Sequence, residues 1–483
     1  MEKDKCGIIR KNFGKLIKLI VISDVLRIKK IIKLLKGFLQ RLKKEQPSAH
    51  KRIQPTIIPR KDHTISRDNI NRNALKVLYR LNSGGYGGFL VGGCVRDLLL
   101  GRRPKDFDIA TDARPEDVRK LFKNCRLIGK RFRLAHIVFG KEIIEVATFR
   151  THHEKAPEHH AKMHEGMIIR DNVYGDIEDD VWRRDFTINS LYYNIADFSV
   201  VDYTNGMQDI KDKMLRMIGD PDQRFHEDPV RLLRAVRFMG KLDISISPET
   251  EAPLTQLSHL IQNVSSARLF QEVLKLFQEG ATAPTFKLLQ KYRLLEQLFP
   301  QTVACLNQPE TEKLLEEALT NTDQRIQEGK TVSPAFLLAV LLWHPVMRYV
   351  AQIQTEELPP YIAIEKAMQH VIKLQTKQLA IPRTLLVSIR EICLLQHHFL
   401  HRHGSRPHRT LEHPRFRAAY DLLLLRIKAG EPVGEIGDWW TQFSEGDTAQ
   451  REKLLKESGK LPHRRKHRSR KFRKKQVPEM PKE

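Results

Sequence analysis

The sequence predicts an α+β protein in which a small mixed α/β head, residues 56–218, precedes an all-helical body, residues 219–459. In the head, short apolar runs with the length and composition of strands alternate with helical or turn segments. From about residue 226, Leu, Ala, Arg and Gln recur at three-to-four spacing, and short turns fall at Pro and Gly. Charge then sets two flexible arms apart from these domains, residues 1–55 and 460–483.

The expected strands of the head are five short runs. They are FLVGG at 89–93, DFDIAT at 106–111, LAHIVF at 134–139, EIIEVATF at 142–149 and SLYYNI at 190–195. Runs of this kind that alternate with helical segments are typical of a mixed sheet covered by helices.

The net charge of +26 is concentrated at the two ends of the chain. Residues 1–60 hold 17 Lys and Arg against 4 Asp and Glu, and residues 460–483 hold 11 against 2. Basic ends attract polyanions over a distance, and salt weakens that attraction. The distribution therefore indicates nucleic acid or an anionic membrane surface as a partner.

The N-terminal arm has the pattern of a basic amphipathic helix. Apolar residues recur at helical spacing and lysines fill the complementary positions from Ile28 to Leu42. Lys18 and Asp24 interrupt its most apolar part, so the segment is too short in apolar residues to span a membrane. Two interpretations stay open: residues 10–44 contact a membrane surface or a partner, or they are a frayed arm upstream of the true start.

The C-terminal arm carries ten Lys and Arg between residues 460 and 475 and almost no apolar residues. Such a segment cannot bury a core, so we expect disorder, with either RNA contact or simple solvation. The five cysteines are odd in number and form no CxxC pair, which argues against a disulfide framework or a zinc site. We therefore expect a cytoplasmic protein, in part membrane-associated.

The strongest chemical signal lies between residues 90 and 110. A Gly pair, Gly92 and Gly93, ends an apolar run at the start of a predicted helix, where phosphate oxygens can approach backbone N–H groups. Asp106 and Asp108 follow at a spacing of two, which places both carboxylates on one face of a strand. Carboxylates paired with phosphate oxygens suit Mg²⁺, so the combination predicts a nucleoside triphosphate site.

Two further carboxylates are candidates for a third acidic group. Glu145 lies in a predicted strand, and Asp185 lies at a predicted strand-to-helix turn. A two-metal phosphoryl transfer uses such a group near the attacking hydroxyl. The alternatives are that Glu145 simply faces solvent, and that Asp185 forms a weak surface ion pair with Arg183 or Arg184.

Four motifs occur in an order that resembles the class II nucleotidyltransferases, the family of bacterial poly(A) polymerases and tRNA CCA-adding enzymes. They are LVGG-VRD-LG-DFD at 90–108, RRDFTINSLYY at 183–193, HEDPVRLLRAVRF at 226–238 and RLFQE at 268–272. The resemblance covers about residues 56–440. Residues 127–140 and the basic C-terminal extension are similar to the poly(A) polymerase branch.

This resemblance implies a polymerase-beta-like head and a template-independent transfer of AMP from ATP to RNA 3′ ends. It implies two Mg²⁺ ions held by Asp106 and Asp108, with Asp185 as a third catalytic aspartate and Glu145 as its competitor or as an additional member. It further implies phosphate contacts from Gly92, Gly93 and Arg96, and triphosphate or ribose contacts from Arg183 and Arg184.

Base selection is assigned by the resemblance to the EDPVR segment, with Glu227, Asp228 and Arg231 as its polar residues. An acid and an arginine one helical turn apart can face both the donor and the acceptor of the adenine pairing edge. The alternative is that Asp228 only caps a helix that begins at Pro229. Arg268 and Glu272, at i and i+4, predict a structural ion pair.

Two histidine-rich stretches have other interpretations. Residues 151–166 lack helical or strand periodicity and the spacing of a tetrahedral site, so we expect a mobile loop beside the active site. The helical body from 226 to 459, with clusters such as the one at 397–409, predicts a track for the RNA backbone, along which Arg and Lys bind without reading base sequence.

Two classes of function remain at this point. The first is an adenylyltransferase that acts on mRNA and other RNAs as a monomer, with RNA decay proteins as partners. Its alternative within the same chemistry is CCA addition to tRNA. The second class is an inert RNA-binding protein on the same scaffold.

Overall fold

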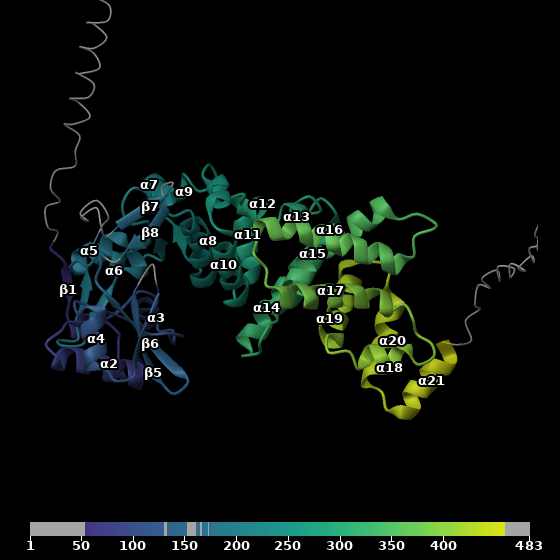
Figure 1. Cartoon of the computed structure of the whole chain (residues 1–483), viewed down its shortest axis with the longest axis horizontal. Helices are drawn as coiled ribbons and strands as arrows, with labels where there is room; N and C mark the ends of the chain where they lie inside the picture. The colour runs from purple at the N-terminus through teal and green to yellow at the C-terminus, as the bar shows by residue number, and fades with distance from the viewer. Residues whose placement is uncertain (1–53, 130–132, 152–160, 165–166, 172, 459–483) are drawn as a thin grey trace, which may run out of the picture. The chain divides into compact units, whose positions relative to one another are not determined.

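The computed structural model describes residues 54–129, 133–151, 161–164, 167–171 and 173–458 (Figure 1). The predicted amphipathic helix of the N-terminal arm and the predicted disordered tail lie outside these residues. The described part from Thr56 onward forms one compact unit.

The head is built on a mixed sheet with the strand order β1-β10-β9-β2-β3-β6-β5-β4. These strands are β1 (Thr56–Ile58), β2 (Gly88–Val91), β3 (Asp108–Thr111), β4 (Cys125–Ile128), β5 (Leu134–Phe139), β6 (Glu142–Thr148), β9 (Tyr192–Asn194) and β10 (Val200–Asp202). Neighbours run antiparallel except β3 and β6, which are parallel. All five predicted strands are present in this sheet, which confirms the mixed head.

Short helices accompany the sheet: α2 (Arg72–Ser83), α3 (Gly93–Leu99), α4 (Pro115–Leu121), α5 (Ile177–Arg183) and α6 (Gly206–Lys211). α2 shows why these residues form a helix. Asn71 caps it by accepting hydrogen bonds from the N–H groups of Asn73 and Ala74. Its buried residues Ala74, Val77, Leu78 and Leu81 follow the three-to-four spacing of one helical face, which packs on the core of the head.

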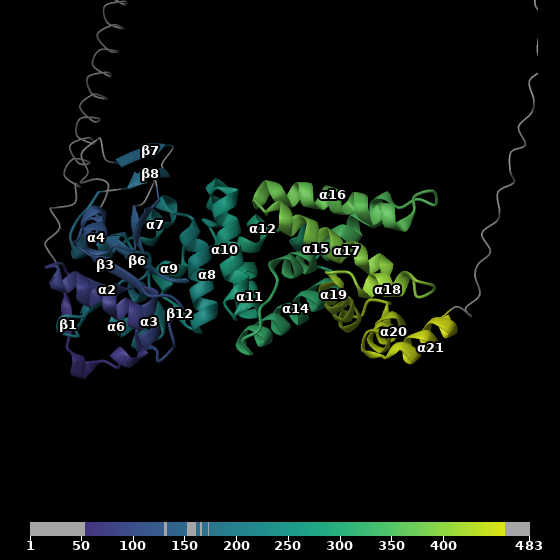
Figure 2. The ribbon, with the colours of Figure 1, turned by 60° about the horizontal axis from the view of Figure 1, so that its bottom comes forward.

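The histidine-rich stretch is only partly the loop that we expected. Residues 161–171 contain two strands, β7 (Ala161–His164) and β8 (Met167–Asp171), which pair antiparallel (Figure 2). The loop predicted for residues 151–166 was wrong for residues 161–164, because a hairpin can form through its backbone ladder without clear side-chain alternation. Residues 152–160 lie outside the described part of the chain.

The body is helical, as predicted. Its helices are α7 (Pro221–Glu227), α8 (Val230–Leu242), α9 (Pro248–Glu251), α10 (Ser266–Gln278), α11 (Thr282–Lys291), α12 (Leu294–Leu298), α13 (Pro300–Val303), α14 (Pro309–Gln327), α15 (Pro334–Ile353), α16 (Pro360–Gln378), α17 (Arg383–His398), α18 (Arg406–Leu411), α19 (Phe416–Ala429), α20 (Gly434–Glu445) and α21 (Thr448–Ser458). One small parallel pair, β11 (Met214–Leu215) with β12 (Ser245–Ile246), lies at its start.

α15 is the central helix of the body and packs against α16 and α17 (Figure 2). By length and composition it could span a membrane, but 56% of its most apolar 18-residue stretch is buried within the body. It is therefore a core helix of this domain.

The last segment of the head packs into the hydrophobic core of the body. Phe186 and Ile188, from the segment after α5, belong to the same buried cluster as Phe238 of α8. The rings of Phe186 and Phe238 meet edge-on with centroids 5.7 Å apart. This packing fixes the RRD segment of the head against the first long helix of the body.

Candidate active site

The two aspartates of the DFD motif stand at the start of β3. Asp108 is the first residue of this strand, and Asp106 lies in the loop just before it. In the parallel pairing of β3 with β6, Asp108 is opposite Glu145. The prediction that one strand carries both aspartates was wrong for Asp106, because β3 begins only at Asp108. The sheet does bring a third carboxylate beside Asp108, which sequence spacing alone could not place.

The pKa of the Asp108 carboxyl is raised to about 6. The largest cause is desolvation of the carboxylate by the surrounding protein, and repulsion from Glu145 and Asp106 also raises the pKa. The positive charge of Arg184 lowers it. Glu145 is half-exposed, and its carboxylate lies 3.4 Å from Nε2 of His136 on β5. Asp108 is thus a crowded acid whose ionised form lacks sufficient positive charge around it.

These features fit a divalent cation. A cation at Asp106 and Asp108 would relieve the repulsion that raises the pKa of Asp108. Among the described residues, no three His, Cys, Asp or Glu side chains group closely enough to hold a metal by themselves. Mg²⁺ does not require such a cage, because it commonly takes one or two carboxylates and completes its shell with water and substrate phosphate.

The Gly pair lies between β2 and α3 as predicted. Gly92 has φ +76°, a left-handed conformation that side chains rarely adopt, and it precedes α3 without a side-chain cap. A Cβ at Gly92 would lie 3.6 Å from Nη1 of Arg184, so this guanidinium lies directly beside the turn. Because Arg184 also acts on Asp108, the turn and the acids are parts of one site.

Arg184 is held in place by two partners. Its guanidinium pairs with Asp180 at 2.8 Å and donates to the Tyr192 hydroxyl at 2.7 Å. Tyr192 in turn donates to Asp180 at 2.6 Å. The sequence alternative of a weak surface pair between Asp185 and Arg184 is therefore wrong, because Arg184 uses the acid four residues before it.

Five arginines interact electrostatically with one another, and one of them, Arg184, lies directly beside this turn: Arg150, Arg183, Arg184, Arg224 and Arg231. Burial, and then the charges of the other four, lower the pKa of Arg183 to about 9. Burial also lowers the pKa of Arg150 and Arg224. Such a concentration of like charge is stabilised by a bound anion, and a triphosphate carries the charge to do so. Sequence reasoning missed Arg150 and Arg224, which belong to none of the family motifs.

Arg96 is placed differently from our expectation of a phosphate contact. It is only 3% exposed. Its Nε and Nη2 donate to Asp97, and its Nη1 donates to the Asn189 side chain at 2.6 Å. These contacts favour a bracing role between α3 and the RRD segment over direct phosphate binding.

Asp185 lies in a saturated network. One oxygen accepts from the Phe186 N–H at 2.8 Å and from Asn189 at 3.2 Å, and the other accepts from Nε of Arg234 in α8 at 2.6 Å. Burial alone would raise the pKa of this carboxyl, but Arg234 and the hydrogen bonds lower it to about 2. Arg234, which sequence reasoning missed, neutralises this aspartate within the protein itself.

The EDPVR segment joins two helices. Asp228 ends α7, and Oδ2 of Asp228 pairs with Nη2 of Arg268 in α10 at 2.7 Å. Arg231 pairs with Glu227 at 3.1 Å. Asp228 accepts from the Val230 N–H at 3.3 Å, but α8 begins at Val230 with Pro229 at the N-cap and no side-chain cap, so the capping alternative is wrong as stated. The expected Arg268–Glu272 pair is wrong.

Glu272 instead pairs with Lys275 at 2.9 Å and faces Arg237 of α8. An i, i+4 spacing permits an ion pair but does not enforce it, and Asp228 offers Arg268 an acid from another helix.

Comparison with known proteins agrees with this site. The family described as "Poly A polymerase head domain" matches residues 88–216, and "Polymerase A arginine-rich C-terminus" matches residues 356–475. The family "Probable RNA and SrmB- binding site of polymerase A" matches residues 243–306. Poly(A) polymerase I of Escherichia coli is 48% identical over 90% of this chain and 96% of its own length. The chain belongs to the poly(A) polymerase I family.

Poly(A) polymerase I relatives match head and body together, whereas other relatives match less of the chain. The CCA-adding enzyme of Bacillus subtilis is 39% identical over 47% of this chain and 55% of its own length. The solved CCA-adding enzyme of Bacillus stearothermophilus in complex with CTP is 24% identical, covers 77% of this chain and 81% of its own, and gives a TM-score of 0.53. This structural similarity confirms the α+β fold that the sequence of this chain predicts.

Proposed function

We propose that this nucleotidyltransferase adds AMP from ATP, without a template, to the 3′ ends of RNA and releases pyrophosphate. The observation that carries the chemistry is the crowded pair Asp106 and Asp108 beside the arginines that surround Arg183. Acids that repel one another beside a concentration of arginines are what a metal-bound triphosphate would satisfy together. Membership in the poly(A) polymerase I family supports ATP and RNA as substrates.

In this proposal Asp106 and Asp108 hold two Mg²⁺ ions. When bound, these ions would activate the RNA 3′-hydroxyl and neutralise charge on the phosphates. The residues of the chain do the rest. Asp108 must be ionised, and Glu145 keeps a second negative charge next to it. The turn at Gly92 leaves room for phosphate, and Arg184, fixed by Asp180 and Tyr192, orients it.

We assign Asp185 a positioning role. Its oxygens are engaged by Arg234, Asn189 and the Phe186 N–H, so it holds α8 against the RRD segment. This contact supports a fixed placement of Arg183 and Arg184, which directly precede it. Glu145 is then the better candidate for a third acid near the metal ions, because it faces Asp108 across the sheet.

Base selection by Asp228 and Arg231 is also part of the proposal. The Arg268–Asp228 pair and the Glu227–Arg231 pair fix the acid and the arginine from two sides. Fixed polar groups can reject a base that leaves them unpaired. Asp228 is one-quarter exposed, so its carboxylate stays accessible to a base edge while it is held.

We further propose that RNA is the macromolecular partner along the body and that the protein acts in the cytoplasm. The basic ends of the sequence support attraction of RNA. Membrane contact through residues 10–44, a monomeric state and RNA decay partners stay predictions.

The test is extension of a labelled RNA with Mg²⁺ and each nucleotide separately, comparing wild type with Asp106→Ala. Long tails from ATP alone that are lost in the variant support the proposal. Addition of C, C and A to a truncated tRNA would instead favour the CCA-adding alternative. RNA binding without extension by the wild type would leave only the inert scaffold.

A further inference from the structure

A pocket separate from the candidate active site lies in the body where α16, α17 and α18 meet. Its volume is about 540 Å³, within the range of roughly 300–1,000 Å³ that is common for small-ligand sites. One tyrosine, four histidines and two arginines contribute most of its lining, and no acid does. We refer to it as the Tyr361 pocket; the residues used below are Tyr361, His397, His398, His401, Arg406 and Arg409.

The rings of the Tyr361 pocket form a stacking surface. Tyr361 of α16 stacks on His398 of α17, with centroids 5.8 Å apart and ring planes at 24°. The ring centroids of Tyr361 and His397 are 5.9 Å apart, and those of His397 and His401, which meet edge-on, are 5.1 Å apart. Burial lowers the pKa of these three histidines, so at neutral pH they present flat, uncharged rings. Such rings suit the faces of nucleobases.

The charge of the pocket is positive. Arg406 and Arg409 are exposed at its rim, and within the part of the chain that the structure describes neither forms an ion pair. Arg409 only donates to the Ser405 hydroxyl at 2.8 Å. Their guanidinium groups therefore stay available to an anion such as phosphate.

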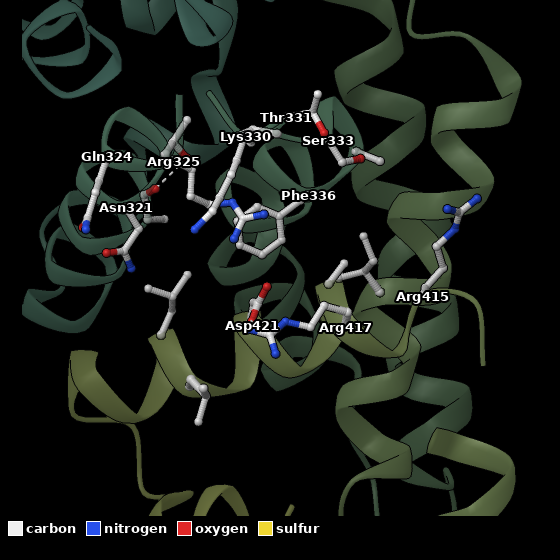
Figure 3. A pocket seen from close by; sticks show the side chains of 18 of the residues that line it. Asn321, Gln324, Arg325, Lys330, Thr331, Ser333, Phe336, Arg415, Arg417 and Asp421 are labelled. Carbon is white, nitrogen blue, oxygen red and sulfur yellow. Dashed lines mark hydrogen bonds and ion pairs between the residues drawn. The ribbon is translucent and has the colours of Figure 1, made fainter. Parts of the chain in front are cut away.

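A larger cavity of the body also contains basic side chains, but most of them form ion pairs. It has a volume of about 700 Å³ and is lined by residues of α14, α15, α17 and α19, and several basic side chains point into it (Figure 3). Acids pair with most of those side chains: Arg417 pairs with Asp421 at 3.0 Å, and Lys330 pairs with Glu328 at 2.6 Å. Most basic side chains of the larger cavity are thus engaged in ion pairs, whereas Arg406 and Arg409 of the Tyr361 pocket form none with the described residues.

We propose that the Tyr361 pocket binds one nucleotide of single-stranded RNA, with the base against Tyr361 and His398 and the phosphates on Arg406 and Arg409. The inference rests on the proposed function, because it takes the RNA substrate as the source of the nucleotide. The residues of the pocket belong to α16, α17 and α18, whereas the acids and arginines of the transfer site belong to the head and α7–α8. The nucleotide bound here is therefore upstream of the reacting 3′ end.

The first test compares Tyr361→Ala with Tyr361→Phe in the full chain. The phenylalanine variant keeps the ring and is the matched control. Binding of a fluorescent oligoadenylate, measured by anisotropy, is expected to weaken about 5- to 100-fold in Tyr361→Ala, the range for one lost stacked base, and to stay unchanged in Tyr361→Phe. Equal weakening in both variants, or none in either, would overturn the stacking assignment.

The second test removes the phosphate contacts. Arg406→Ala with Arg409→Ala is expected to weaken oligoadenylate binding and to reduce the slope of log Kd against log salt by about one to two. Arg325→Ala, at the larger cavity, removes the same kind of charge from the same domain and serves as the control. If Arg325→Ala changes the slope as much as the double variant does, the pocket is not a specific contact.

Two further measurements distinguish RNA from free nucleotide as the ligand of the pocket, and failure of the pocket proposal from failure of the proposed function. The KM for ATP is expected to be the same in Tyr361→Ala and wild type. A rise only in the ATP KM, with RNA binding unchanged, would assign the pocket to free nucleotide and overturn the RNA proposal. If wild type binds oligoadenylate through the pocket but does not extend it, the proposed function fails while the pocket stands.

Discussion

Asp108 and Asp185 are both motif aspartates of the head, yet their surroundings are opposite. Asp108 faces Glu145 and Asp106, and its pKa is raised to about 6. Asp185 faces Arg234 and hydrogen-bond donors, and its pKa is lowered to about 2. Asp108 lies beside two like charges, whereas Asp185 is neutralised by Arg234 of α8. A motif position therefore does not by itself tell a metal ligand from a structural brace.

The difference also sets the sign of two contributions to stability. The folded protein binds a proton at Asp108 more tightly than the unfolded chain, so ionisation of Asp108 destabilises the fold as pH rises from about 3.8 to about 6. The Asp185 contribution is present above its unfolded value and is lost as pH falls toward about 2.

The largest expected effect is on catalysis. Asp108→Asn removes a proposed metal ligand, so AMP addition is expected to fall by about 10³-fold or more, the loss that corresponds to several kcal/mol of transition-state stabilisation. The melting temperature is expected to stay equal or rise, because a repelled charge is removed. Single-turnover extension and thermal melting measure the two effects. A variant that melts early would show that Asp108 is needed for the fold.

The next effect is on stability. Arg234→Ala leaves Asp185 buried without its cation, which is expected to destabilise the fold by about 2–3 kcal/mol, below the range for fully buried pairs because Arg234 is partly exposed. Denaturant unfolding of the two single variants and of the double variant Asp185→Asn with Arg234→Ala gives the coupling energy. Additive effects would mean that the pair does not act as a brace.

A third prediction concerns pH and metal together. At limiting Mg²⁺, activity is expected to decline as pH falls through about 6, because protonated Asp108 cannot bind the ion. A tenfold increase in Mg²⁺ is expected to move the midpoint down by up to about one pH unit, since the metal displaces the proton. A midpoint that ignores the Mg²⁺ concentration would assign the titration to another group.

The smallest expected effect concerns base selection. Arg268→Ala frees Asp228 from its partner in α10, so the preference for ATP over CTP is expected to drop by about 2- to 5-fold, as for the loss of one partly exposed ion pair. Competition assays with the two nucleotides measure this ratio. Lys275→Ala, which breaks the neighbouring pair with Glu272, is the control and is expected to leave it unchanged.

The sequence was sufficient for the local parts of this site. The spacing of Asp106 and Asp108, the Gly pair and the apolar runs are short-range patterns, and each predicted strand was found in the sheet. The motif order also predicted the α+β family. These features depend on residues that lie within a few positions of one another.

The rest depends on contacts between distant residues. Arg234 meets Asp185 across 49 positions, and Arg268 meets Asp228 across 40. No local pattern selects these partners, because only the packing of α8 and α10 brings them within reach. For the same reason the Arg268–Glu272 pair was expected from spacing but is not formed.

The contrast between the two aspartates is tested most directly by calorimetric titration with Mn²⁺, a substitute for Mg²⁺, into wild type, Asp108→Asn and Asp185→Asn. Circular dichroism first confirms that each variant is folded at the titration temperature. The account predicts that wild type and Asp185→Asn bind Mn²⁺ and that Asp108→Asn does not. Binding lost in Asp185→Asn but kept in Asp108→Asn would contradict it.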